Sequence, residues 1–79
     1  MRVRTERQES GPIPSETVVA IRTTAGNTEE VIVDSSQVDA SGVEVGFIGQ
    51  RGDEVLVELP RETLRGRWRL WVPKSAIAA

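Results

Sequence analysis

Short runs of alternating apolar and polar residues, separated by glycine and proline, constrain this chain more than any other feature. The runs cover residues 17–24, 30–34, 42–49, 54–59 and 67–72, and valine is their commonest residue. No long segment shows the period of 3.6 residues that an amphipathic helix requires. We therefore predict an all-β fold of five or six short strands, built as a small barrel or a rolled antiparallel sheet.

The alternation also separates two faces in each predicted strand, because successive side chains of a strand point to opposite sides. In the first two runs Val19 and Ile21 share one face, and so do Val31 and Val33. In the last three runs the residues expected in the core are Val43, Val45, Phe47, Val55, Val57, Leu59, Trp68, Leu70 and Val72. Between the first two runs, Gly26-Asn27 predicts a two-residue type II′ hairpin turn. Gly46 indicates a bulge or bend in the third run, and Gly52 is expected at positive φ in the tight turn that follows it.

The first fifteen residues differ from the rest of the chain. They are polar, they contain Pro12 and Pro14 directly after Gly11 and Ile13, and they show no apolar periodicity. We predict a disordered N-terminal arm over residues 1–15 and a single small β-barrel domain over residues 16–79. The arginines of the arm are expected to be solvated.

The residue inventory bears on catalysis and on metal or cofactor sites. The chain has no cysteine, histidine or tyrosine, and its one lysine, Lys74, adjoins Ser75, so the two side chains diverge on an extended strand. The acidic residues of the second run match no calcium-loop spacing. We expect no enzyme activity from one protomer, and neither a metal nor a cofactor. An enzyme subunit whose site forms only on oligomerisation stays open as an alternative.

The formal net charge of −2 conceals two regions of opposite sign. Residues 16–60 carry nine acidic side chains against Arg22 and Arg51, a balance of −7, whereas residues 61–75 carry five basic side chains against Glu62, a balance of +4. Such a domain is able to meet a partner, or a second copy of itself, through either region. No window approaches the roughly 18 consecutive apolar residues of a membrane span, so a cytoplasmic protein without membrane contact is expected.

The run at residues 67–72 carries the candidate binding site. Alternation places Arg67, Arg69 and Trp71 on the face opposite the core, a spacing that suits stacking of guanidinium groups on an indole ring. The basic residues around this strand complete the candidate set, which is Trp71, Arg67, Arg69, Arg65, Arg61 and Lys74. The alternative interpretation is a tryptophan at the rim of the core whose edge the arginines solvate.

The ending Trp71-Val72-Pro73-Lys74-Ser75-Ala76-Ile77 resembles the strand, 3₁₀ turn and short final strand that close SH3-like small barrels. The resemblance implies the barrel and not the ligand, because SH3 domains that bind proline-rich peptides are expected to carry a tyrosine-rich motif and this chain has no tyrosine. We hypothesise a non-enzymatic interaction module that binds another protein or a copy of itself through the arginine and tryptophan face. A single-stranded nucleic-acid binder using the same face is the alternative.

Overall fold

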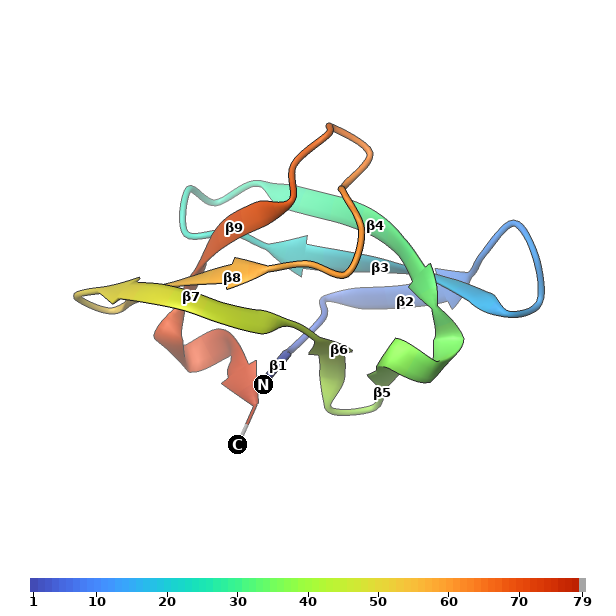
Figure 1. Ribbon diagram of the computed structural model, residues 1–79, viewed down its shortest axis with the longest axis horizontal. Helices are drawn as coiled ribbons and strands as arrows, with labels where there is room; N and C mark the ends of the chain where they lie inside the picture. The colour runs from blue at the N-terminus through green and yellow to red at the C-terminus, as the bar shows by residue number, and fades with distance from the viewer. Residues whose placement is uncertain (79) are drawn as a thin grey trace.

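The computed structural model describes residues 1–78, which form ten β-strands and two 3₁₀ turns without an α-helix (Figure 1). The all-β prediction is therefore confirmed. The strands are β1 (Arg2–Val3), β2 (Arg7–Ser10), β3 (Glu16–Arg22), β4 (Thr28–Asp34), β5 (Val38–Asp39), β6 (Gly42–Glu44), β7 (Gly46–Arg51), β8 (Glu54–Glu58), β9 (Arg69–Pro73) and β10 (Ile77–Ala78), and the 3₁₀ turns are η1 (Ser35–Gln37) and η2 (Lys74–Ala76). Within these residues, no helix is long and apolar enough to cross a membrane.

The strands pair antiparallel in three sheets, with the orders β10-β1-β6-β5, β2-β3-β4 and β7-β8-β9. Closing a barrel requires every strand to pair on both sides. Among the described residues, β7 pairs with β8 alone and lies at the edge of its sheet, so the three sheets do not join into a closed barrel. The prediction of a barrel is wrong in this respect.

The core lies between the sheets and is built mainly from valine. Its members are Val3, Val19, Ile21, Val31, Val33, Val43, Val45, Val55, Val57, Leu59, Leu70 and Val72. Seven of these twelve were expected in the core from the sequence, and Val19, Ile21, Val31 and Val33 lie on the faces on which the alternation grouped them. Val3 is the addition. Small β-branched side chains pack well on facing pleated surfaces, which explains how so short a chain fills its interior.

The N-terminal segment is ordered, so the prediction of a disordered arm over residues 1–15 is wrong. Strand β1 lies between β10 and β6, and its Val3 is fully buried. Strand β2 pairs with β3 along all four of its residues. The alternation in Arg2-Val3-Arg4 is too short to stand out in the sequence, and only pairing on both sides of β1 reveals it as a strand.

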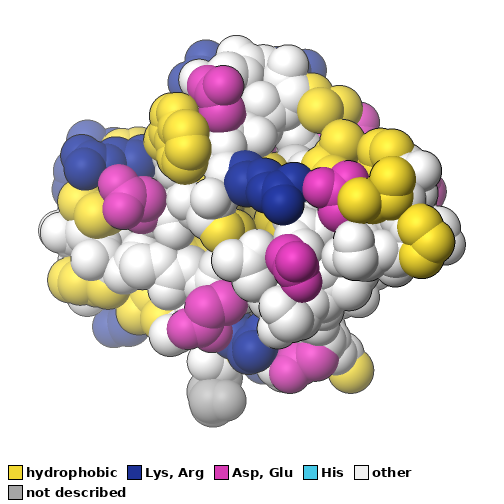
Figure 2. All heavy atoms as spheres, turned by 45° about the vertical axis from the view of Figure 1, so that its right-hand side comes forward, with side chains coloured by type: hydrophobic (Ala, Val, Ile, Leu, Met, Phe, Trp, Pro, Cys, Tyr) yellow, Lys and Arg dark blue, Asp and Glu magenta, His cyan; other side chains and the backbone are white. Residues whose placement is uncertain are grey.

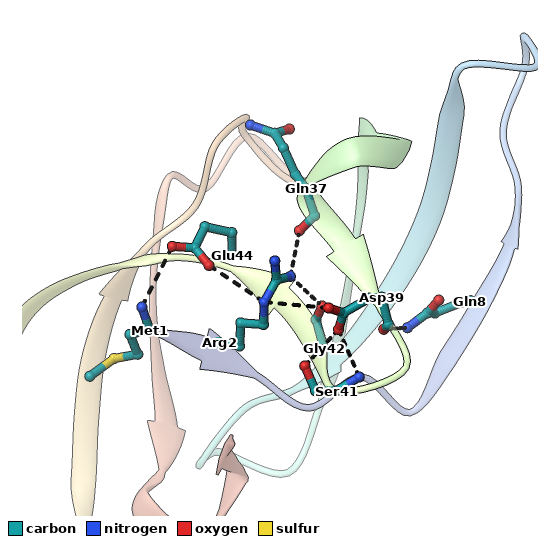
Figure 3. A network of polar contacts seen from close by, with 8 residues as sticks. All are labelled: Met1, Arg2, Gln8, Gln37, Asp39, Ser41, Gly42 and Glu44. Carbon is teal, nitrogen blue, oxygen red and sulfur yellow. Dashed lines mark hydrogen bonds and ion pairs between the residues drawn. The ribbon is translucent and has the colours of Figure 1, made fainter. Parts of the chain in front are cut away.

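Gly42 shows how closely β1 packs against its neighbour. The residue has a φ of +130°, and a Cβ atom at this position would lie 2.0 Å from the carbonyl oxygen of Val3. Only glycine allows this approach of two backbones. The guanidinium of Arg2 then donates to the carbonyl oxygens of Gln37 and Gly42 at 3.3 and 3.0 Å, which ties the N-terminal segment to the η1 and β6 region (Figure 3).

Two aromatic residues expected in the core are exposed instead. Phe47 is 55% exposed because β7 is an edge strand that extends beyond the core, although its side chain has the same orientation as that of its partner Val57. The β-bulge expected at Gly46 lies between Phe47 and Gly49, where the register with β8 shifts. Trp68 is 51% exposed, because β9 begins one residue later, at Arg69.

The turn between β3 and β4 is longer than the predicted type II′ turn. The Thr23 N–H donates to the Asn27 carbonyl oxygen at 2.9 Å, and the Gly26 N–H donates to the Thr23 carbonyl oxygen at 3.0 Å. Gly26 has a φ of +91°. Gly26 therefore follows the two central residues of the turn instead of being the first of them. In the next hairpin, Gly52 has a φ of +57°, which confirms the prediction.

The C-terminal order of strand, 3₁₀ turn and short strand is confirmed by β9, η2 and β10. This order is local, and an SH3-like architecture for the whole chain stays a prediction.

Candidate binding cleft

A cleft of about 500 Å³ opens beside β9, where the turn between β3 and β4 meets the loop between β8 and β9. It is lined by Thr23, Thr24, Ala25, Asn27, Glu29, Arg51, Glu54, Arg65, Arg67, Arg69, Leu70 and Trp71. Four of the six residues predicted for the binding site, Arg65, Arg67, Arg69 and Trp71, lie in this lining. We call this surface the arginine cleft.

The other two predicted residues lie elsewhere. Arg61 forms an ion pair with Glu16, with Nη1 2.7 Å from Oε2. Lys74 borders a separate hollow together with Asp53, Pro73 and Ser75. The loop and the final turn therefore place these two cations outside the arginine cleft.

Two turns of the same form border the cleft, although they lie 40 residues apart in the sequence. In each, a buried threonine begins a Thr-x-x-Gly segment: Thr23 to Gly26 and Thr63 to Gly66. The Thr63 N–H donates to the Arg67 carbonyl oxygen and the Gly66 N–H donates to the Thr63 carbonyl oxygen, both at 2.8 Å. The first turn has the same two bonds, at 2.9 and 3.0 Å. These bonds fix the backbone of the loop that carries the arginines.

The Thr63 side chain adds a second set of contacts to this loop. Its Oγ1 accepts from the backbone N–H groups of Arg65 and Arg67 at 3.3 and 3.2 Å. The Leu64 N–H donates to the Glu30 carbonyl oxygen at 2.8 Å, which holds the loop against β4. The side chains of Arg65 and Arg67 thus project from a backbone that is anchored at both ends.

Glu29 is the residue of the cleft that sequence reasoning missed. Its side chain is only 2% exposed. On β4 it shares its orientation with Val31 and Val33, so it points into the space between the sheets. The signal was present in the sequence, because the alternation places Glu29 on the same face as the two valines.

The contacts of the Glu29 carboxylate are incomplete. Oε2 accepts a hydrogen bond from Asn27 Nδ2 at 3.0 Å, and it lies 3.7 Å from Arg67 Nε and 3.9 Å from Arg65 Nη1. Oε1 is buried and has no hydrogen-bond partner among the described residues. A buried carboxylate oxygen without a partner is costly, and in native structures it calls for a specific explanation.

Trp71 is covered by an arginine, but not by one of those predicted. The Arg51 guanidinium lies 4.2 Å from the centre of the indole ring, which is a cation–π contact. Arg51 also pairs with Glu54 at 3.3 Å, and Arg69 turns to Glu58 at 3.2 Å. The turn between β7 and β8, not the neighbouring positions of β9, supplies the stacking cation.

Arg65 and Arg67 differ from the other arginines of the cleft. Both side chains are 65% exposed, and both reach only the one oxygen of Glu29, at distances beyond a hydrogen bond. Two cations therefore share one carboxylate at a distance, and most of their N–H donors face solvent. Guanidinium groups in this state suit a carboxylate or phosphate group, which accepts two parallel hydrogen bonds from one arginine.

The charges outside the cleft are largely paired. Figure 2 shows acidic and basic side chains interspersed over one face of the molecule. Arg7 contacts Glu30 at 2.9 Å, and Arg22 contacts Glu6 at 2.6 Å. Among residues 1–78, no cluster of three or more acidic side chains is placed to hold a metal ion.

Comparisons with known proteins return no match. No protein-family model matches the sequence, no curated protein resembles it, and no solved structure matches its fold.

Proposed function

We propose that this protein is a non-enzymatic interaction module that binds an acidic segment of another protein in the arginine cleft. The observation that carries the proposal is the pair of exposed, incompletely bonded guanidinium groups of Arg65 and Arg67 beside the buried Glu29 carboxylate. The two arginines bind a carboxylate of the partner. As they turn toward it, Glu29 Oε1 becomes available to accept an N–H of the partner's backbone.

Two features favour a peptide over single-stranded nucleic acid, which is the second candidate. The carboxylates of Glu29 and Glu54 line the cleft and repel a chain of closely spaced phosphates, whereas a peptide backbone offers them N–H donors. The indole of Trp71 is already covered by Arg51, so that ring face is not open for a base to stack on. Trp68 is the exposed ring that nucleic acid would need.

Fluorescence anisotropy with a labelled glutamate-rich peptide and with a labelled oligothymidine of equal length tests the proposal. We expect the peptide to bind more tightly than the oligonucleotide at equal salt. Arg67→Glu should weaken peptide binding at least tenfold, since it replaces a donor with a repelling charge; tenfold corresponds to about 1.4 kcal/mol.

Lys74→Glu is the matched control, because it changes the net charge by the same amount at a position outside the arginine cleft. Equal weakening by the two substitutions would show that only the overall charge matters and would overturn the proposal. Tighter binding of the oligonucleotide, with quenching of tryptophan fluorescence, would assign the cleft to nucleic acid instead.

A further inference from the structure

The outer edge of β9 runs along the arginine cleft. In the sheet order β7-β8-β9, this strand pairs with β8 alone among the described strands (Figure 1). Arg69, Leu70 and Trp71 all line the cleft. Successive side chains of a strand point to opposite faces, so three consecutive lining residues place the hollow against the edge of the strand.

The pairing with β8 decides which backbone groups of β9 point to this edge. The Leu59 N–H donates to the Trp68 carbonyl oxygen at 2.8 Å, so these residues form a hydrogen-bonded pair. Hydrogen-bonded and non-hydrogen-bonded pairs alternate along an antiparallel ladder, so the pairs of Arg69 and Trp71 with β8 are non-hydrogen-bonded. The backbone N–H and C=O groups of Arg69 and Trp71 therefore point away from β8.

One of these four groups has a partner within the chain. The Thr24 N–H, in the turn between β3 and β4, donates to the Trp71 carbonyl oxygen at 2.9 Å. Among the described residues, no backbone group accepts from the N–H of Arg69 or Trp71, and none donates to the Arg69 carbonyl oxygen. Two donors and one acceptor thus stand in a row along the cleft, and such a row bonds to the backbone of an added strand.

The charges beside this edge identify an acidic segment as its occupant. Arg67 precedes Arg69 by two residues, and Arg65 and Arg67 are the guanidinium groups that reach only one distant oxygen of Glu29. The guanidinium of Arg69 does not count, because it is paired with Glu58. Nucleic acid would match these charges but has no backbone of alternating N–H and C=O groups, so it does not fit the edge.

We propose that the acidic segment binds as an extended strand added to the outer edge of β9. Its backbone accepts from the N–H groups of Arg69 and Trp71 and donates an N–H to the Arg69 carbonyl oxygen, while one of its carboxylates binds Arg67. The pairing ends at Trp71, because Thr24 already occupies the carbonyl oxygen there.

The strand pairing rests on the proposed function and defines the partner further. A helix bonds its own N–H and C=O groups internally, so it has none to offer this edge. The partner is therefore an acidic stretch of chain that is free to extend, not the charged face of an acidic helix.

Hydrogen exchange of backbone amides, measured by NMR on the full chain with and without the glutamate-rich peptide, tests the proposal. In the free protein the amides of Arg69 and Trp71 should exchange rapidly, because they face solvent. At a peptide concentration that occupies about nine-tenths of the protein, both should exchange about tenfold more slowly, since only the remaining tenth leaves them open. The Gln50 amide is the matched control: it lies in a non-hydrogen-bonded pair at the outer edge of β7, and it should stay fast.

Two variants link the protection to the arginine cleft. Arg67→Glu should leave the amides of Arg69 and Trp71 fast at the same peptide concentration, because the peptide binds more weakly. Lys74→Glu, which changes the charge outside the cleft, should behave as the wild type. The dispersion of the amide resonances shows whether each variant is folded.

The outcomes separate the strand pairing from the proposed function. Peptide binding seen by anisotropy, with the amides of Arg69 and Trp71 still fast, would overturn the added strand and leave the proposed function standing. No peptide binding would overturn both. Amides that are slow without peptide would also overturn the added strand: slowing that disappears on dilution would show that a second copy covers the edge, and slowing at every concentration would show that the edge is closed within one chain.

Discussion

The arginines of the N-terminal segment and those of the arginine cleft differ in what their guanidinium groups contact. Arg2 donates to two backbone carbonyl oxygens and lies within 3.7 Å of Asp39 and Glu44 (Figure 3). Arg65 and Arg67 have no side-chain hydrogen bond among the described residues and share one oxygen of Glu29 at 3.7 Å or more. The first group is part of the folded framework, and the second has unused donors.

This difference shows that a count of basic residues does not locate a binding surface. The sequence places three arginines in the first seven residues and three between Arg65 and Arg69. Each arginine of the first group contacts a carboxylate or a carbonyl that lies far away in the sequence: Arg2 contacts Gln37, Arg4 contacts Ser75 and Arg7 contacts Glu30. Unused hydrogen-bonding capacity, which depends on those distant partners, is the more informative quantity.

Removing the N-terminal segment should have the largest effect. A fragment of residues 16–79 loses β1 and β2, including the core residue Val3 and the strand that joins β10 to β6. We expect this fragment to show no cooperative thermal unfolding by circular dichroism, because a core this small has little stability to spare. A fragment that melts cooperatively, near the melting temperature of the full chain, would show that the N-terminal segment is not needed for the folded core.

A pair of matched substitutions compares the two groups of arginines directly. Arg2→Met keeps the length of the side chain but removes its hydrogen bonds to the carbonyls of Gln37 and Gly42, and we expect a loss of about 1 to 2 kcal/mol in the free energy of unfolding. Arg65→Met should cost less than about 1 kcal/mol, as is usual for an exposed ion pair. Urea titration measures both values. Equal losses would remove the distinction between the two groups.

Glu29→Gln should act in the opposite direction. The amide still accepts the hydrogen bond of Asn27 but removes an incompletely paired buried charge, so we expect the free energy of unfolding to rise by about 1 kcal/mol. Its NH₂ group would present a donor in place of Oε1, so binding of the glutamate-rich peptide should weaken. A lower melting temperature would show that Arg65 and Arg67 already compensate the carboxylate.

The smallest effect should be the change in folding stability with pH, and it should come from carboxyl groups outside the cleft. Hydrogen bonds from Arg22 lower the pKa of Glu6, and those from the Ser36 backbone and hydroxyl lower the pKa of Asp34. Hydrogen bonds from Ser41, whose hydroxyl lies 2.6 Å from Asp39, lower the pKa of Asp39 in the Arg2 network.

The sign of the effect follows from these directions. The unfolded chain binds protons at higher pH than the folded chain, so the stabilisation is complete above the ordinary values of 3.8 for Asp39 and 4.5 for Glu6. It is lost as the pH falls through the lower folded-state pKa values. Melting temperatures measured across this acidic range should fall with pH, and the fall should be shallower for Asp39→Asn. An unchanged slope in that variant would remove Asp39 from the effect.

Much of the fold could be predicted because the alternation of apolar residues is a local property. The hairpin of β3 and β4, the strands β8 and β9 and nearly all core valines follow from it. Phe47 and Trp68 were assigned wrongly because alternation gives only the direction of a side chain. Whether that side is covered depends on the position of the strand in its sheet and on where the strand begins.

The candidate site could be predicted only in part. Alternation brought Arg67, Arg69 and Trp71 to one surface, and Arg65, predicted as a basic residue near this strand, lies in the same cleft, whereas Arg61 and Lys74 do not. The cation that stacks on Trp71 comes from another hairpin, and no local pattern indicates it. Glu29 could have been found from its parity with Val31, but a carboxylate in the core contradicts the usual preference of charged residues for the surface.

The sequence by itself determined the all-β class, the strands from β3 onward that show apolar alternation, and that cysteine, histidine and tyrosine chemistry is absent. Those properties depend on residue identity and on the two-residue repeat of an extended backbone. Only the tertiary structure decided that the N-terminal residues complete the core, that β7 is an open edge, and that Arg65 and Arg67 keep unused donors beside a buried Glu29. These outcomes depend on contacts between residues far apart in the chain, which no local pattern contains.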